Sequence, residues 1–347
     1  MAGSGAEPQG GGSRCGRAHQ ELVPSPTILD EIKLHFKETD GLDQIVAFSP
    51  DLVVVSLGDQ DEEIEYFKRL KESKLPYVIV NQLTKEERFW PIRANTAADV
   101  KAAYLSAARV FFASRNNHRV MEERLSCALP NSDIHYNPFH IDRTAVPPFP
   151  PLAAGLRLAV AGKLLFIHKG QDILVEVLKA EKWKGRDLIF NIYGVGPDRE
   201  RLELMARDYG VTNLVFHGRE PDIGNIWRDN HAIVLPSRME GMPITLISAL
   251  LSARVPIVTD IGGHAEIVDD GVTGFLASSP SVEALDEALE RAFAARDQWK
   301  EIGQRARERV LAYLPDDPVD DFIQKILPLA KGGGGSVERD AKQSGPA

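Results

Sequence analysis

The chain has 347 residues, of which 43% are hydrophobic, and its formal net charge is −9 at neutral pH. This length and apolar content suffice for two hydrophobic cores, so two globular domains are expected. The acidic balance argues against nucleic acid or an anionic membrane surface as a partner, although it allows a local cationic pocket. No apolar run approaches the roughly 18 residues that span a bilayer, so no transmembrane segment is predicted.

The two ends of the chain and its cysteines indicate where in the cell the protein is located. Residues 1–20 are rich in glycine and serine and residues 331–347 contain a GGGGS run, so both are predicted to be disordered tails. The N-terminus lacks the apolar segment of a secretory signal. Cys15 and Cys127 are the only cysteines, so a disulfide framework is not expected. These features together predict a cytoplasmic protein.

Residues 21–146 alternate between strand and helix patterns, which predicts a first domain. The predicted strands are 52–57, 77–80, 110–113 and 134–136, and the predicted helices lie near 28–36, 42–46, 64–70, 100–108 and 118–125. Strands that alternate with helices form a parallel sheet. We therefore expect an α/β domain with helices on both faces of its sheet.

A proline cluster separates this region from the next. Four of the five residues from Pro147 to Pro151 are proline, which blocks regular structure, so an interdomain linker is predicted over 147–155. Residues 156–316 then form the second domain. Its predicted strands are 156–161, 188–193, 214–216, 232–235, 256–258 and 274–276, enough for a complete doubly wound sheet. Ser281 is expected to cap a helix, and the last apolar helix falls within 317–330.

A glycine-rich turn, Tyr193-Gly194-Val195-Gly196-Pro197, follows one of these strands. The third glycine of the G-x-G-x-x-G dinucleotide fingerprint is absent because Arg199 takes its place. The segment therefore gives little support to an NAD-dependent dehydrogenase. A structural turn into the next helix accounts for it better.

The stretch 234–275 contains two strand-loop-helix units. A strand ends at Pro236, the polar loop 237–241 follows, and Pro243 opens a helix, where its missing N–H has no acceptor anyway. The buried helix face carries Ile244, Ile247, Leu250 and Leu251, and the opposite face carries a small polar stripe of Thr245, Ser248 and Ser252. A helix N-terminus at the carboxyl end of a parallel strand attracts anions, so phosphate is the expected ligand.

This stretch resembles a known enzyme family. S-R-x-E-G-x-P, then T-D-x-G-G-x-x-E and D-G-x-T-G-F-L, are similar to the donor half of family 4-type retaining glycosyltransferases, the glycosyl transferases group 1. The resemblance implies the GT-B fold: two Rossmann-like doubly wound parallel-sheet domains, with the 317–330 helix returning to the first. Nothing between residues 20 and 50 reads as the family's opening strand and glycine-rich turn. The first domain is therefore expected to be incomplete on its acceptor side.

The resemblance also implies a set of donor-binding residues. Lys163, at the position of the usual arginine, and Lys169 match the two cations that grip the donor diphosphate, with Gly162 beside them. Lysine supplies the charge but not the bidentate fork of arginine. The alternative is that both are merely solvated loop lysines. Gly218 and Arg219 would border the nucleotide base, and a plain surface turn is the alternative there.

Only the first of the two glutamates in the family's E-x₇-E pattern is present in this chain. Glu240 matches the first glutamate, which contacts hydroxyls of the transferred sugar; the alternative is an acid that only favours the nearby helix N-terminus. The second position is Ser248, too short to accept both ribose hydroxyls as a carboxylate does. The resemblance adds further donor contacts at Gly241, Met242, Pro243, Ile244, Gly262, Gly263 and Glu266. Glu266 is expected to orient the loop or to cap the following helix, and His264 to be structural.

Two functions stay open on this basis. The first is transfer of a hexose-like sugar from a nucleotide-diphospho-sugar to an acceptor hydroxyl on a glycan, lipid or small molecule, without a metal or other cofactor. The second is a non-catalytic relative that binds a nucleotide or a partner protein. Ser248 and the short first domain favour the second, whereas Glu240, Lys169 and Gly262-Gly263 favour the first.

Overall fold

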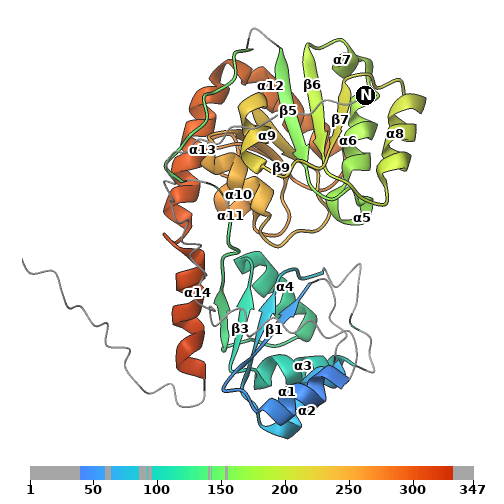
Figure 1. The fold of residues 1–347 in the computed structure, drawn as a ribbon. Coiled ribbons are helices and arrows are strands. Elements are labelled where there is room, and N and C mark those ends of the chain that lie inside the picture. Colours follow the sequence, from blue (N-terminus) through green and yellow to red (C-terminus); the bar gives the residue numbers. More distant parts are fainter. Residues whose placement is uncertain are drawn as a thin grey trace, which may run out of the picture.

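The computed structural model describes residues 40–58, 64–85, 92, 96–139, 141, 143–152 and 155–330. Two parallel-sheet units lie one above the other, and helix α14 (Pro318–Ile326) lies alongside the lower one (Figure 1). The predicted tails at 1–20 and 331–347 and the helix near 28–36 lie outside the described residues, as does much of the region in which the opening strand was sought. The next helix along the chain is α1 (Asp40–Phe48).

The first unit contains a four-stranded parallel sheet in the order β1-β2-β3-β4. Its strands are β1 (Val53–Leu57), β2 (Tyr77–Asn81), β3 (Arg109–Phe112) and β4 (Ser132–Ile134), and its helices after α1 are α2 (Ile64–Ser73), α3 (Ala97–Ser106) and α4 (Arg115–Leu125). β2 is buried throughout, as its apolar sequence YVIVN predicts. The expected strand at 134–136 lies two residues earlier, because β3 ends at Phe112, the partner of Ile134.

The second unit contains six parallel strands in the order β10-β9-β8-β5-β6-β7. They are β5 (Leu156–Ala161), β6 (Leu188–Tyr193), β7 (Leu214–Gly218), β8 (Ala232–Leu235), β9 (Val255–Thr259) and β10 (Phe275–Ala277). Numbered within the domain, this is the 3-2-1-4-5-6 order of the doubly wound fold. The order reverses between β5 and β8, which are neighbours in the sheet. The carboxyl ends of these two strands are therefore the expected binding position.

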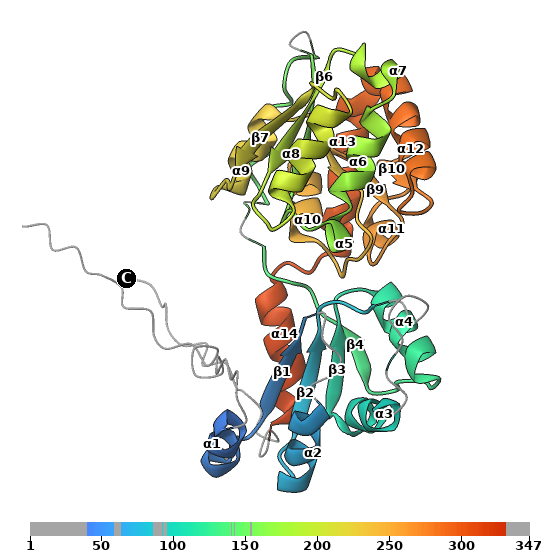
Figure 2. The same cartoon turned by 90° about the vertical axis from the view of Figure 1, so that its right-hand side faces the viewer.

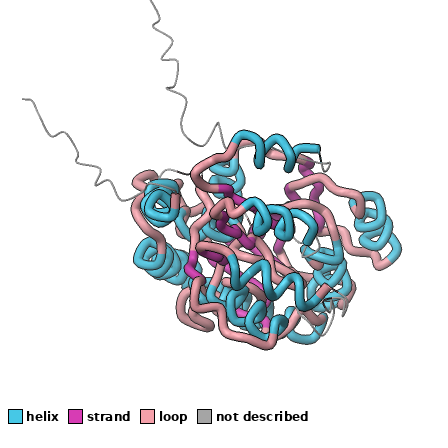
Figure 3. Tube along the Cα trace, turned by 90° about the horizontal axis from the view of Figure 1, so that it is seen from below, coloured by secondary structure: helices cyan, strands magenta, loops and turns pink. Residues whose placement is uncertain are grey.

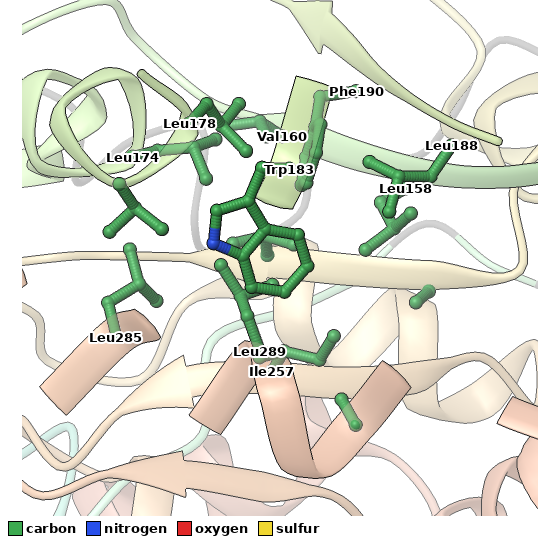
Figure 4. Close-up of a cluster of buried hydrophobic side chains, with 14 of the residues drawn as sticks. Leu158, Val160, Leu174, Leu178, Trp183, Leu188, Phe190, Ile257, Leu285 and Leu289 are labelled. Carbon is green, nitrogen blue, oxygen red and sulfur yellow. The ribbon is translucent and has the colours of Figure 1, made fainter. Parts of the chain in front are cut away.

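Helices cover both faces of this sheet. They are α5 (Phe166–Lys169), α6 (Gln171–Leu178), α7 (Glu181–Lys184), α8 (Arg199–Asp208), α9 (Ile223–Asp229), α10 (Ile244–Leu251), α11 (His264–Ile267), α12 (Val282–Ala294) and α13 (Trp299–Tyr313). Figure 2 shows the strands of this sheet running between the helices, and Figure 3 shows the molecule from below, with helices around the strands. On one face Trp183 fills the core among Leu174, Phe190 and Leu289 (Figure 4). As predicted, the Ser281 side chain caps α12 by accepting from the N–H of Ala284.

Arginine side chains bind the two segments that cross between the units. Arg254 is fully buried, and its guanidinium donates to the carbonyls of Pro147 and Pro148 in the proline-rich linker. Burial lowers the pKa of Arg254 to about 10, so the group stays charged at neutral pH. Arg143 donates to the carbonyls of Pro315 and Asp316 in the second crossing segment, at 2.6 and 2.8 Å. Both crossings are therefore held by charge-assisted bonds to backbone oxygens.

The helix α14 (Pro318–Ile326) lies against the sheet of the first unit (Figure 2). The Phe322 ring packs edge-on against Phe111 at 5.0 Å, and Lys325 Nζ donates to the Ile134 carbonyl at 2.9 Å. His135 is buried beside Phe322, and burial together with the charge of Lys325 lowers its pKa to about 4. The imidazole is therefore neutral at pH 7.

This burial predicts an acid-sensitive contact between α14 and the first sheet. The unfolded chain takes up a proton at His135 near pH 6.5 and the folded chain only near 4, so stability falls as the pH drops through this window. Between pH 7 and 5, the free energy of unfolding of the wild type should fall through protonation of His135 in the unfolded chain. In His135→Gln this fall should be smaller by roughly 1–2 kcal/mol, as measured by urea denaturation at the two pH values. The exposed His217→Gln is the control, and equal pH dependence of His135→Gln and the wild type would refute the assignment.

Candidate functional site

The candidate site lies at the switch point of the second sheet. Lys163 follows β5 by two residues and Glu240 follows β8 by five, so the two predicted motifs emerge from the adjacent central strands. Parallel strands present their carboxyl ends at one sheet edge. The order of the strands thus brings together segments that are more than seventy residues apart.

Glu240 and Lys169 form the central contact of the site. Lys169 Nζ lies 2.7 Å from Glu240 Oε1, and the Ser237 hydroxyl donates to the same oxygen at 2.8 Å. Glu240 is only 7% exposed, and the Lys169 side chain is 26% exposed. A carboxylate this buried stays charged only when paired and hydrogen-bonded. Sequence reasoning assigned these residues to different parts of the donor, whereas the structure makes them partners.

A second contact that sequence reasoning missed fastens the same loop. Arg238 forms a bidentate pair with Asp172, with N···O distances of 2.6 and 2.8 Å. The backbone N–H groups of Arg238 and Met239 both donate to the His168 carbonyl. The loop after β8 is therefore fixed to the segment that begins α6. The signal was present in the sequence, because both residues stand inside the two motifs.

Lys163 lines a cleft of about 610 Å³ between the two domains. The second domain contributes Lys163 and Ile167 to this cleft, and the first contributes Gly58, Leu83 and Lys85. Gly58 and Leu83 follow the carboxyl ends of β1 and β2. Both sheets therefore direct their carboxyl ends toward this space.

The paired glycines Gly262 and Gly263 pack against the Glu240 loop. A Cβ on Gly262, whose φ is +57°, would lie 2.2 Å from the Glu240 carbonyl oxygen, and a Cβ on Gly263 would lie 2.3 Å from the Met242 side chain. The Gly263 N–H donates to the Gly241 carbonyl at 2.8 Å. Glycine is required at both positions because the two loops of the protein are in direct contact there.

The turn at Gly194 also needs glycine for a contact within the protein. A Cβ on Gly194 would lie 1.9 Å from the Gly162 carbonyl oxygen, which supports the structural interpretation of that motif.

Glu266 joins the two domains. One carboxylate oxygen accepts from the N–H of Asn116 at 3.0 Å, at the start of α4, and the other accepts from the Tyr313 hydroxyl at 2.7 Å. Burial and the neighbouring Glu266 raise the pKa of Tyr313, so its hydroxyl remains a donor. Sequence reasoning placed this carboxylate on its own loop or helix. It is instead an N-terminal partner for a helix of the other domain.

Ser248 lies in the interior of the second domain. It is 1% exposed, its hydroxyl accepts from Trp227 Nε1 at 3.2 Å, and it donates to the Thr245 carbonyl at 2.9 Å. Ser252 is equally buried. The expected polar stripe on α10 is thus largely covered, because α9 and α13 pack on this helix. Pro243 is the N-cap residue of α10 rather than its first helical residue.

Gly218, Arg219 and His264 are the remaining predicted residues. Gly218 has φ +76° and accepts from the Gly194 N–H, and Arg219 is exposed beside it. Just before them, the His217 ring stacks on Tyr193 at 4.6 Å. His264 is fully buried and bonds the Thr259 carbonyl through Nδ1, and burial lowers its pKa. A neutral, internally bonded imidazole is consistent with the expected structural role.

Among the described residues, no three or more His, Cys, Asp or Glu side chains are grouped so that they could hold a metal ion. Within the same residues, no helix combines the length and apolar character needed to cross a membrane.

Comparison with known proteins identifies the second domain. Residues 154–309 match the family model described as Glycosyl transferases group 1. This domain belongs to that glycosyltransferase family. Among curated relatives, a glycogen synthase of Pseudomonas syringae pv. syringae (strain B728a) is 28% identical over 164 residues, 47% of this chain and 32% of the relative. A putative colanic acid biosynthesis glycosyltransferase, WcaL of Escherichia coli (strain K12), is 26% identical over 59% of this chain and 51% of its own.

Solved glycosyltransferase structures share the two-domain fold over most of this chain. HepE of Anabaena, solved in complex with UDP, has a TM-score of 0.69 at 15% identity, over 82% of this chain and 81% of its own. TarM of S. aureus has a TM-score of 0.65 at 15% identity, over 83% of this chain and 57% of its own. The chain therefore has the GT-B fold, as predicted. It spans about a third of the length of the glycogen synthase that it matches.

The interdomain bond of Glu266 is testable by hydrogen exchange. Glu266→Ala removes the acceptor of the Asn116 N–H, so we expect exchange at the start of α4 to accelerate roughly fivefold to tenfold, the equivalent of about 1–1.4 kcal/mol. Glu203→Ala, which removes an exposed carboxylate paired with Arg199 on α8, is the matched control. Unchanged exchange at Asn116 would show that the bond does not hold the domains together.

The buried hydroxyl of Ser248 leads to a separate prediction. Ser248→Ala leaves the buried Trp227 N–H without its partner, so we expect a loss of about 1–3 kcal/mol in the free energy of unfolding. Denaturant titration measures this loss. Ser279→Ala, in the partly buried turn before α12, serves as the comparison substitution. A stability equal to that of the wild type would mean that the Trp227 bond contributes nothing.

Proposed function

We propose that this glycosyltransferase moves a hexose-like sugar from a nucleotide-diphospho-sugar to an acceptor hydroxyl, with retained anomeric configuration as in family 4. The observation that carries the proposal is the Lys169–Glu240–Ser237 cluster at the switch point, with Lys163 facing the interdomain cleft. HepE of Anabaena has been solved in complex with UDP and with UDP-glucose. Those ligands support a nucleotide sugar as the donor here.

The chain's own groups suggest how the donor is held. The diphosphate lies against Lys163 and two backbone N–H groups, that of Gly241 in the loop and that of Ile244 at the start of α10. The first N–H groups of a helix have no acceptor within it. Gly162, Gly262 and Gly263 border this position. Oε1 of Glu240 already serves Lys169 and Ser237, which leaves Oε2 to accept from hydroxyls of the transferred sugar.

Catalysis in this proposal is electrostatic and positional. The bond between the anomeric carbon and the leaving phosphate oxygen breaks, the acceptor oxygen bonds that carbon on the same face, and the leaving phosphate oxygen takes the acceptor proton. The negative charge on the leaving group develops beside Lys163 and the α10 N-terminus. No metal or other cofactor enters this scheme. The cytoplasmic location expected from the cysteine content stays a prediction.

A non-catalytic nucleotide-binding or partner-binding protein is the second candidate. The observation that favours it is the burial of Ser248 against Trp227, because no carboxylate stands at this position to accept the ribose hydroxyls. A donor bound without that contact loses on the order of 1–3 kcal/mol of affinity, or roughly 5- to 150-fold.

Calorimetric titration separates the two candidates. The purified chain is titrated in magnesium-free buffer with UDP, GDP, ADP and their glucose or mannose conjugates. We expect micromolar binding of one nucleotide and roughly tenfold weaker binding by Lys163→Ala, which removes a charge-assisted phosphate contact. Lys300→Ala, an exposed lysine on α13, is the control.

Hydrolysis or transfer of the sugar from the conjugate that binds then decides between enzyme and binder. Binding without turnover toward any hydroxyl acceptor or water would favour the binding protein. No binding of any nucleotide at millimolar concentration would overturn both the donor site and its assignment to Lys163.

A further inference from the structure

The chemistry of the interdomain cleft bears on the acceptor, which the comparisons leave open. Two lysines face the cleft from opposite domains, Lys85 from the first and Lys163 from the second. None of the described residues that line it is acidic, although the chain as a whole carries a net charge of −9. In an acidic protein, the described lining of the cleft therefore carries lysines without a carboxylate beside them, which favours an anionic ligand.

Neither lysine is neutralised by the part of the protein that the structure describes. Lys169 is paired with Glu240, whereas Lys85 and Lys163 form no ion pair with a carboxylate of the described residues. The donor diphosphate accounts for Lys163 in the function proposed above. Lys85 stands across the cleft on the first domain, beyond the end of β2, and the donor motifs give it no role.

Apart from Gly58 and His168, the rest of the described wall is aliphatic or thioether. Leu83 comes from the first domain, and Leu165, Ile167 and Met239 come from the second. Ile167 is 50% exposed, on the one-turn helix α5 that borders the cleft. Exposed aliphatic side chains next to fixed cations suit a ligand that carries both an apolar chain and a negative group.

We propose that the acceptor is an anionic amphiphile, a molecule that carries the acceptor hydroxyl and a phosphate group on an apolar chain, whose phosphate lies against Lys85 and whose chain lies along Leu83 and Ile167. This inference rests on the proposed glycosyltransferase function and names its acceptor class. The phosphate supplies charge-assisted bonds to the ammonium group. The apolar chain removes the aliphatic wall from water.

Calorimetry with simple probes tests the inference. The chain is titrated with n-octyl phosphate, n-octyl glucoside and inorganic phosphate below the micelle concentration, with and without the nucleotide that binds best. We expect n-octyl phosphate to bind at least tenfold more tightly than either other probe. Lys85→Ala should weaken it roughly tenfold and leave the nucleotide Kd unchanged. Lys300→Ala should change neither value, and Ile167→Ser should weaken n-octyl phosphate several-fold without affecting inorganic phosphate.

Each result that differs from these expectations would overturn a specific part of the inference. Equal binding of n-octyl glucoside would exclude recognition of the charge, and equal binding of inorganic phosphate would mean a free-phosphate site without a chain. Weaker nucleotide binding by Lys85→Ala would assign that lysine to the donor. One outcome would overturn the proposed function and leave this inference standing. In that case no nucleotide binds, while n-octyl phosphate, measured without nucleotide, still binds more tightly than the other two probes.

Discussion

The burial of the Glu240 carboxylate is the constraint on which the rest of the site depends. A charged group that is 7% exposed would destabilise the fold by several kcal/mol without partners. Lys169 and Ser237 supply those partners, so the loop after β8 and the helix after β5 have to lie against each other. The bidentate pair of Arg238 and Asp172 reinforces the same approach. Two motifs far apart in the sequence thus form one rigid surface at the switch point.

This surface also determines how the two domains meet. A Cβ at Gly241 would lie 2.0 Å from the carbonyl oxygen of Gln82 in the first domain, so the Glu240 loop is in backbone contact with that domain. Asn117 donates to the Glu240 carbonyl at 3.3 Å, and Glu266 accepts from Asn116. The loops expected to touch only a donor therefore also carry the interdomain contact. Movement of one domain would therefore act directly on the loop that carries the Glu240 carboxylate.

The departure from the family pattern at Ser248 has a structural counterpart. The indole N–H of Trp227 requires a partner because the ring is completely buried, and the serine hydroxyl provides one. The pair fastens α9 to α10. A residue that sequence comparison presents as the loss of a donor contact is, in the folded protein, a satisfied part of the core. The change at this position is therefore compatible with a stable domain, whatever its effect on donor affinity.

The sequence by itself determined most of the strands, several of the longer helices and the resemblance to the family, because apolar periodicity and short motifs are local signals. The strands 156–161, 188–193 and 232–235 were predicted with the bounds that the structure gives them. Only the tertiary structure decided which charged groups meet. Lys169 reaches Glu240, Glu266 reaches α4 and Arg254 reaches the proline-rich linker through contacts across the fold, which depend on strand order and domain packing. Such long-range pairings produce no periodic pattern in the sequence, because the partner of a side chain depends on which distant segments the fold brings together.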